Sequence, residues 1–143
     1  MTSSDKQDDS QPAVLVVDDE PEVLRLVETI LTEQGYRVLV ANGGDSALKV
    51  FQEKDTRPDL VLTDVVMPGM SGPMLVDQLM AIDPNIKVLF MSGYDDRQVV
   101  HRYVVSKGFQ LISKPFTVKK LAGAVQSVLR EKPPALESSE TTA

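Results

Sequence analysis

Short, mostly apolar runs alternate with longer amphipathic stretches along most of the chain. The runs are four to six residues long and lie at 13–17, 36–40, 59–63, 86–91 and 109–112. Runs this short are typical of buried strands in a parallel sheet. Between them, apolar residues recur at helical spacing, as Val23, Val27 and Leu31 do. The alternation predicts an α/β fold of five strand–helix units, in which helices cover both faces of a parallel sheet.

Residues that favour helix ends mark the five predicted helices. The expected first residues or caps are Pro21, Asp45, Pro73, Asp95 and Thr117. Gly35 and Gly108 are expected to end the first and fourth helices. The apolar stripe predicted for the third helix is Met74, Leu75, Leu79 and Ile82. The stripe predicted for the last helix is Val118, Leu121, Val125, Val128 and Leu129.

The length of 143 residues fits one domain with a sizeable core. We expect this domain at residues 12–131, between disordered polar tails at 1–11 and 132–143. The sequence has no run of 18 apolar residues and no secretory signal, so we expect no membrane span and a cytoplasmic location.

Composition narrows the possible chemistry. Cysteine is absent, which excludes disulfides, a thiol nucleophile and a thiolate metal site. The single histidine, His101, excludes a site with several histidine ligands. The net charge is −6 and no basic stripe is present, which argues against nucleic acid as a direct partner.

Polar residues stand at the carboxyl ends of four predicted strands. Asp18 and Asp19 follow the first, Asp64 the third, Ser92 the fourth and Lys114 the fifth. The carboxyl ends of parallel strands share one edge of the sheet, where open α/β sheets bind their ligands. The topology therefore predicts that these side chains converge on one cleft. Asp64 taken alone is a helix cap, a metal ligand or a nucleophile.

Three carboxylates in one cleft either raise a pKa or recruit a cation. Without cysteine or clustered histidine, the expected cation is a hard one that prefers oxygen ligands, Mg²⁺ or alternatively Mn²⁺. A lysine and a hydroxyl at the same edge supply donors for an anion. These are the groups that phosphoryl transfer requires, with Asp64 able to attack phosphorus itself.

Four segments carry these strand ends: VLVVDDE at 14–20, DLVLTDVVMPGMSG at 59–72, VLFMSG at 88–93 and LISKPF at 111–116. In this order they resemble the receiver domains of two-component response regulators, which include the chemotaxis regulators. The resemblance covers residues 12 to about 130. It implies a flavodoxin-like, doubly wound, three-layer fold with five helices and strand order 2-1-3-4-5.

The resemblance also implies roles for individual residues. Asp64 is expected to be the phosphoacceptor, with Ser92 and Lys114 contacting the phosphoryl group. The expected Mg²⁺ ligands are Asp19 and Asp64 directly, Asp18 through water, and the backbone carbonyl of Val66. Pro115 takes the place of the proline that follows a cis peptide bond in this family.

The implied function is to accept a phosphoryl group from a phosphohistidine of a histidine kinase or a histidine phosphotransfer protein. The domain then signals by conformational change, and it is not an enzyme on other substrates. The face formed by residues 95–130 is expected to dock an effector or a second copy of the chain.

Two positions depart from the family pattern. Leu111 stands where the family has a switch aromatic, three residues before the lysine. Val66 is apolar where the family positions the attacking water, so we expect a long-lived phosphoryl group. Three alternatives stay open: a receiver from the carboxyl end of a hybrid histidine kinase, a Mg²⁺-dependent phosphohydrolase, and a pseudo-receiver that binds partners without phosphorylation.

Overall fold

The computed structural model describes residues 11–53, 57–93, 102, 104 and 106–131. Its five strands are β1 (Ala13–Val17), β2 (Arg37–Ala41), β3 (Leu60–Asp64), β4 (Lys87–Ser92) and β5 (Gln110–Ser113). All neighbouring pairs are parallel, and the strand order is β2-β1-β3-β4-β5. The predicted parallel sheet and its order are confirmed, although several predicted strands are displaced by one residue.

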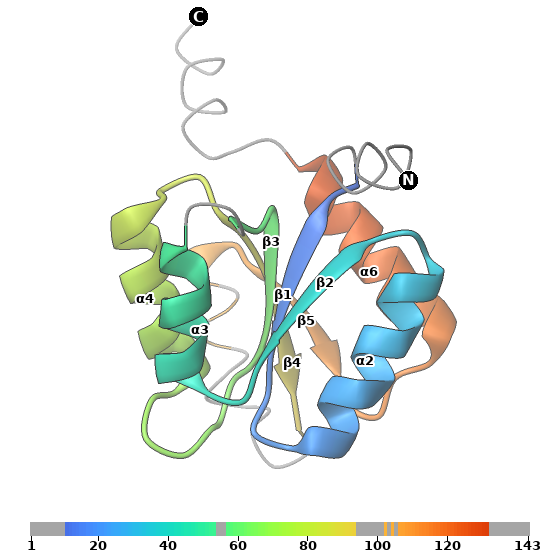
Figure 1. Cartoon of the computed structure of the whole chain (residues 1–143), viewed down its shortest axis with the longest axis horizontal. Helices are drawn as coiled ribbons and strands as arrows, with labels where there is room; N and C mark the ends of the chain where they lie inside the picture. The colour runs from blue at the N-terminus through green and yellow to red at the C-terminus, as the bar shows by residue number, and fades with distance from the viewer. Residues whose placement is uncertain (1–10, 54–56, 94–101, 103, 105, 132–143) are drawn as a thin grey trace, which may run out of the picture.

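The helices bounded within the described residues are α2 (Pro21–Glu33), α3 (Gly44–Gln52), α4 (Gly72–Ile82) and α6 (Val118–Arg130). Figure 1 shows α3 and α4 on one face of the sheet and α2 and α6 on the other. The predicted three-layer arrangement is confirmed. The helix expected from Asp95 falls mostly on residues 94–101, 103 and 105, which lie outside the described residues. The expected tail at 132–143 lies outside them as well, as do residues 1–10 of the tail expected at 1–11. None of the described helices is long and apolar enough to cross a membrane.

Alternate residues of the central strands pack into two separate cores, one on each face of the sheet. Leu15, Val17 and Val61 pack with α3 and α4, whose buried residues include Phe51 and Leu75. The intervening strand residues, with the inner faces of α2 and α6, form the second core: Val14, Val16, Leu60, Leu62, Val27, Leu31, Leu121 and Val125. Both faces of β1 and β3 are buried, which explains why β1 is a continuous apolar run and why β3 is apolar up to Leu62.

The helix boundaries follow the predicted signals in part. Pro21 opens α2, Gly35 after α2 has a φ of +98°, and the Thr117 side chain accepts from the Lys120 amide at 3.1 Å. The prediction that Asp45 caps α3 is wrong, because the helix already begins at Gly44 and Asp45 lies in its first turn.

The predicted apolar stripes of two helices need correction. Met74 and Ile82 of α4 are exposed, and the buried face consists of Gly72, Leu75, Val76 and Leu79, at spacings of three and four residues. Val118 is exposed as well, because the inner face of α6 begins one turn later, at Leu121.

Candidate functional site

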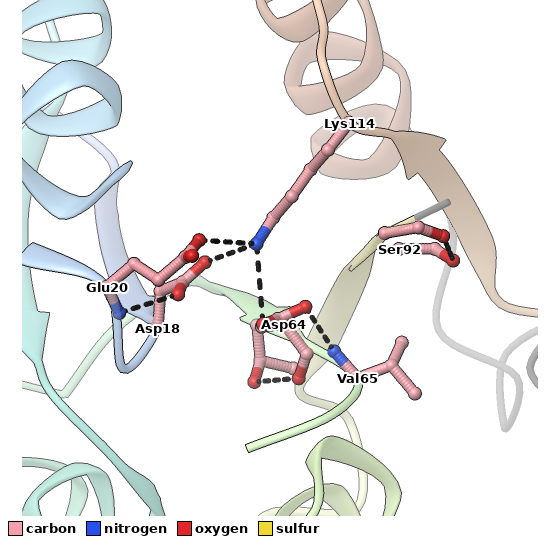
Figure 2. Close-up of polar contacts among 8 residues, drawn as sticks. Asp18, Glu20, Asp64, Val65, Ser92 and Lys114 are labelled. Atoms are coloured by element: carbon pink, nitrogen blue, oxygen red, sulfur yellow. Dashed lines mark hydrogen bonds and ion pairs between the residues drawn. The ribbon is translucent and has the colours of Figure 1, made fainter. Parts of the chain in front are cut away.

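The carboxyl edge of the sheet gathers the polar side chains that follow its strands. Asp18 follows β1, Asp64 is the last residue of β3, Ser92 is the last residue of β4, and Lys114 follows β5. Asp18, Asp64 and Ser92 are buried. Parallel pairing fixes their relative depth, because Asp64 stands in register with Met91 and Ser92 with Ser113. Figure 2 shows the Lys114 side chain reaching across this edge towards Asp18 and Asp64.

Lys114 is the centre of the polar network. Its Nζ lies 2.8 Å from Oδ2 of Asp18, 3.3 Å from Oδ2 of Asp64 and 3.7 Å from Oε1 of Glu20. The other carboxylate oxygens are held by backbone amides: Glu20 donates to Oδ1 of Asp18 and Val65 to Oδ1 of Asp64, both at 2.9 Å. One ammonium group therefore serves three carboxylates.

Glu20 is the site residue that the sequence-based prediction left out. Its side chain is largely exposed and reaches Lys114 from the first turn beyond β1. The available signal was its place as the third consecutive acid after the strand, in Asp18-Asp19-Glu20. That position alone also fits an acidic residue beside a helix N-terminus, favoured by the helix dipole.

A cation site fits the same edge. Asp18, Asp19 and Asp64 each offer an oxygen ligand atom, and these atoms lie within 4.8 Å of one another. Asp18 and Asp64 are buried, whereas Asp19 is exposed and opens the group to solvent. An all-oxygen donor set with solvent access suits Mg²⁺, which binds through a few carboxylates and keeps several waters. The donor chemistry therefore fits the expected metal.

Burial and charge set the protonation of the two central groups. Burial raises the pKa of Asp64 from 3.8 to about 6; the positive charge of Lys114 opposes this rise, and the negative charge of Asp18 adds to it. Burial alone would lower the pKa of Lys114. Its hydrogen bond to Asp18 and the charges of Asp64 and Asp18 outweigh burial, so the pKa of Lys114 is raised. Lys114 is therefore charged at neutral pH. Asp64 is ionised at this pH as well, and its ionisation costs folding free energy.

Ser92 and Val66 lie at the edge of this network. The Ser92 hydroxyl donates to the carbonyl of Gly93 at 3.1 Å. Val66 follows the amide that binds Asp64, and its side chain is 56% exposed. The peptide bond between Lys114 and Pro115 is cis, as the resemblance implied.

Leu111 occupies a half-buried position in β5. It stands in register with Phe90 and packs against the core on the α3 and α4 side. Phe109 packs edge-on against Phe90, with ring centroids 5.5 Å apart and an interplanar angle of 75°. The aromatic side chain in this part of the core thus comes from Phe109, two residues before the expected switch position.

Comparison with known proteins agrees with this fold. Residues 14–126 match the family model of the response regulator receiver domain. The chain belongs to this family and is a receiver domain of two-component signalling.

Three relatives illustrate the range of the family. The chain is 36% identical to the sensor kinase CckA of Brucella abortus. The match covers 82% of this chain and 12% of the kinase. It is 30% identical to the sporulation initiation phosphotransferase F of Bacillus subtilis, over 81% of this chain and 92% of that one. The chemotaxis protein CheY4 of Vibrio cholerae has a similar structure, with a TM-score of 0.75 and 26% identity over 83% of this chain and 99% of that one. The chain thus spans only a small part of one relative and nearly the whole of the other two.

Proposed function

We propose that this receiver domain, at residues 12–131, accepts a phosphoryl group on the carboxylate of Asp64 from a phosphohistidine, with Mg²⁺ as cofactor. The observation that carries the proposal is the arrangement around Lys114. Its ammonium group lies 2.8 Å from Asp18 and 3.3 Å from Asp64, at an edge where Asp19 adds a third carboxylate. A cation site and a fixed positive charge therefore flank one buried nucleophile.

The transfer exchanges one bond for another. A P–O bond forms to a carboxylate oxygen of Asp64, while the P–N bond of phosphohistidine breaks and its electron pair returns to the imidazole. The residues that would hold Mg²⁺ are Asp18, Asp19, Asp64 and the backbone carbonyl of Val66. The bound cation would neutralise charge on the transferring group.

Lys114 and Ser92 act after the new P–O bond forms. Lys114 would pair with the phosphoryl oxygens in place of the ionised Asp64. The Ser92 hydroxyl, now donating to Gly93, would rotate to donate to a phosphoryl oxygen. The added charge would reorganise the face at residues 95–130, and this face would dock an effector or a second copy of the chain.

The phosphodonor is a histidine kinase or a histidine phosphotransfer protein. Its imidazole must come within bonding distance of Asp64, so its surface must rest on the rim of the site. A groove of about 360 Å³ opens on this rim beside Lys114, and it is lined by Val23, Leu26, Lys114, Pro115 and Phe116. Leu26 is 51% exposed there. An exposed apolar groove beside the reacting carboxylate suits a partner that docks transiently.

The direct test is to incubate the protein with acetyl phosphate or phosphoramidate and Mg²⁺ and to weigh the intact chain. We expect a single phosphate adduct in the wild type and in Asp45→Asn, which removes an exposed carboxylate in α3. The adduct should be absent in Asp64→Asn. No adduct with any donor favours the pseudo-receiver, and continued turnover of varied phosphoesters favours the phosphohydrolase.

A receiver within a hybrid histidine kinase is the second candidate. Its support is the identity of 36% to the sensor kinase CckA of Brucella abortus. The two candidates differ in the direction of transfer. A receiver in a relay passes its phosphoryl group on to a histidine phosphotransfer protein, so transfer from phosphorylated Asp64 to such a protein, faster than hydrolysis, supports this second candidate.

A further inference from the structure

The loop from Val65 to Gly72 is closed at its base. The Gly72 amide donates to the carbonyl oxygen of Val65 at 2.7 Å, which joins the first residue of α4 to the residue after β3. Val66 is therefore the first residue inside a short closed loop. Any change in the position of Gly72 moves the start of this loop relative to Asp64.

Gly72 also makes a close approach that no other residue type allows. A β-carbon added to Gly72 would lie 2.3 Å from the carbonyl oxygen of Asp64 and 3.0 Å from Cα of Val65. These are backbone atoms, which no side-chain rotation can move aside. Among the described residues, the glycines with positive φ are Gly35, Gly69 and Gly108, so backbone conformation does not demand glycine at position 72. Glycine is required at position 72 by the close contact between α4 and the backbone of Asp64.

The carbonyl of Asp64 is held from a second direction. The Thr63 hydroxyl donates to this carbonyl oxygen at 2.9 Å, and Thr63 is fully buried. The carbonyl of the expected phosphoacceptor therefore accepts from the Thr63 hydroxyl and also lies close to Gly72. The two contacts fix the backbone from which the Asp64 carboxylate and the Val66 carbonyl both extend.

We propose that Gly72 and Thr63 are positioning residues of the Mg²⁺ site. They hold the backbone at Asp64 and Val65 so that the Asp64 carboxylate and the Val66 carbonyl reach the same cation. This inference rests on the metal ligands named in the proposed function. Groups that orient metal ligands typically change metal affinity by 10- to 100-fold when they are replaced.

The test measures Mg²⁺ affinity of the full-length, unphosphorylated protein by isothermal titration calorimetry. Gly72→Ala must push α4 away from Asp64 by roughly 0.7 Å, the difference between 2.3 Å and the 3.0 Å below which real β-carbon contacts essentially do not occur. We expect the dissociation constant for Mg²⁺ to rise by roughly 10- to 100-fold. Gly69→Ala is the matched control, because it strains the same loop at a φ of +82° with no atom within 4 Å of the added β-carbon.

A second variant keeps the test decisive if Gly72→Ala does not fold. Thr63→Val keeps the shape of the side chain and removes only the hydroxyl that donates to Asp64. We expect a rise in the Mg²⁺ dissociation constant of roughly fivefold, the equivalent of the about 1 kcal/mol that one hydrogen bond contributes. A purely structural role predicts a lower Tm with unchanged Mg²⁺ affinity at 10 °C, where both variants are compared in the folded state.

Several outcomes overturn the inference. Wild-type affinity in folded Gly72→Ala, or in Thr63→Val if the first variant does not fold, refutes positioning while leaving phosphorylation of Asp64 intact. An equal loss in Gly69→Ala shows that general loop strain is the cause. Wild-type protein that binds no Mg²⁺ refutes the metal site on which the inference rests. Wild-type protein that binds Mg²⁺ but forms no adduct with either acetyl phosphate or phosphoramidate refutes the proposed function and leaves this inference standing.

Discussion

Removing the negative charge of Asp64 should stabilise the metal-free protein. Asp64 is 6% exposed, and burial raises its pKa from 3.8 to about 6. The folded protein therefore resists ionisation of this carboxyl, although Lys114 lies 3.3 Å away. Asp64→Asn keeps the size of the side chain and an oxygen that can accept from the Val65 amide.

The magnitude follows from the two pKa values of Asp64. One pKa unit corresponds to about 1.4 kcal/mol, so ionising Asp64 in the folded protein costs up to about 3 kcal/mol. Between pH 4 and 6 the folded state binds more protons than the unfolded state, so wild-type stability falls as the pH rises through this window. At pH 7.5, Asp64→Asn should be more stable by up to about 3 kcal/mol, which raises Tm by on the order of 10 °C. Below pH 4 the advantage should vanish.

The assay is thermal unfolding of both proteins in EDTA at a series of pH values from 3.5 to 8, followed by circular dichroism. Asp45→Asn, which removes an exposed carboxylate of α3, is the control for the loss of one negative charge. Equal stability of Asp64→Asn and wild type at pH 7.5 would refute the reasoning. So would an advantage that does not depend on pH, because it would arise from packing and not from the ionisation of Asp64.

Three further substitutions test other parts of the structure. Lys114→Met leaves three carboxylates without their shared ammonium, so it should lower metal-free stability at pH 7.5 by about 3 kcal/mol; an unchanged urea midpoint in EDTA contradicts this. Thr117→Ala removes the acceptor for the Lys120 amide and should cost about 1 kcal/mol in urea unfolding, whereas Thr117→Ser should retain wild-type stability. Val66→Asn should shorten the lifetime of the Asp64 adduct by roughly tenfold, because an amide can orient the attacking water. The lifetime is measured by intact mass after the donor is removed. An equal lifetime in both proteins speaks against this role.

The sheet could be predicted from sequence because strands that are buried on both faces consist mostly of successive apolar residues. The residues of β1 and β3 are all buried, so no polar residue interrupts β1 before Asp18, and Thr63 is the one polar residue of β3 before Asp64. Strand order required the resemblance to receiver domains, since the apolar runs of β2 and β5 carry no mark of their neighbours. The structure and the family match confirm that order.

The helix faces were harder to predict because an apolar residue at helical spacing can still be exposed, above all near a helix end. In α4 the apolar residues Met74 and Ile82 fit the same spacing as Leu75 and Leu79, yet they are exposed. The buried face of α4 begins instead at Gly72, which lies close to the backbone of Asp64.

The candidate site was predictable as a set of residues but not as a network. Strand ends indicated Asp18, Asp64, Ser92 and Lys114, because topology brings them to one edge. Spacing could not show that Lys114 binds Asp18 more closely than Asp64, at 2.8 Å against 3.3 Å. Nor could it show that Glu20 joins them. Such details depend on side-chain reach across the sheet edge.

The same electrostatic imbalance links stability to metal affinity. Lys114 contacts Asp18, Glu20 and Asp64, and Asp19 adds a fourth carboxylate beside them, so negative charge is in excess when no cation is bound. A divalent cation that binds only the folded protein would relieve this excess and stabilise the fold by an amount that rises with the logarithm of its affinity. Substitutions that change the excess must therefore move the two quantities in opposite directions. Asp64→Asn should gain metal-free stability and lose Mg²⁺ affinity, whereas Lys114→Met should lose metal-free stability and bind Mg²⁺ more tightly at pH 7.5. Parallel changes in either variant would show that charge is not what couples this site to the fold.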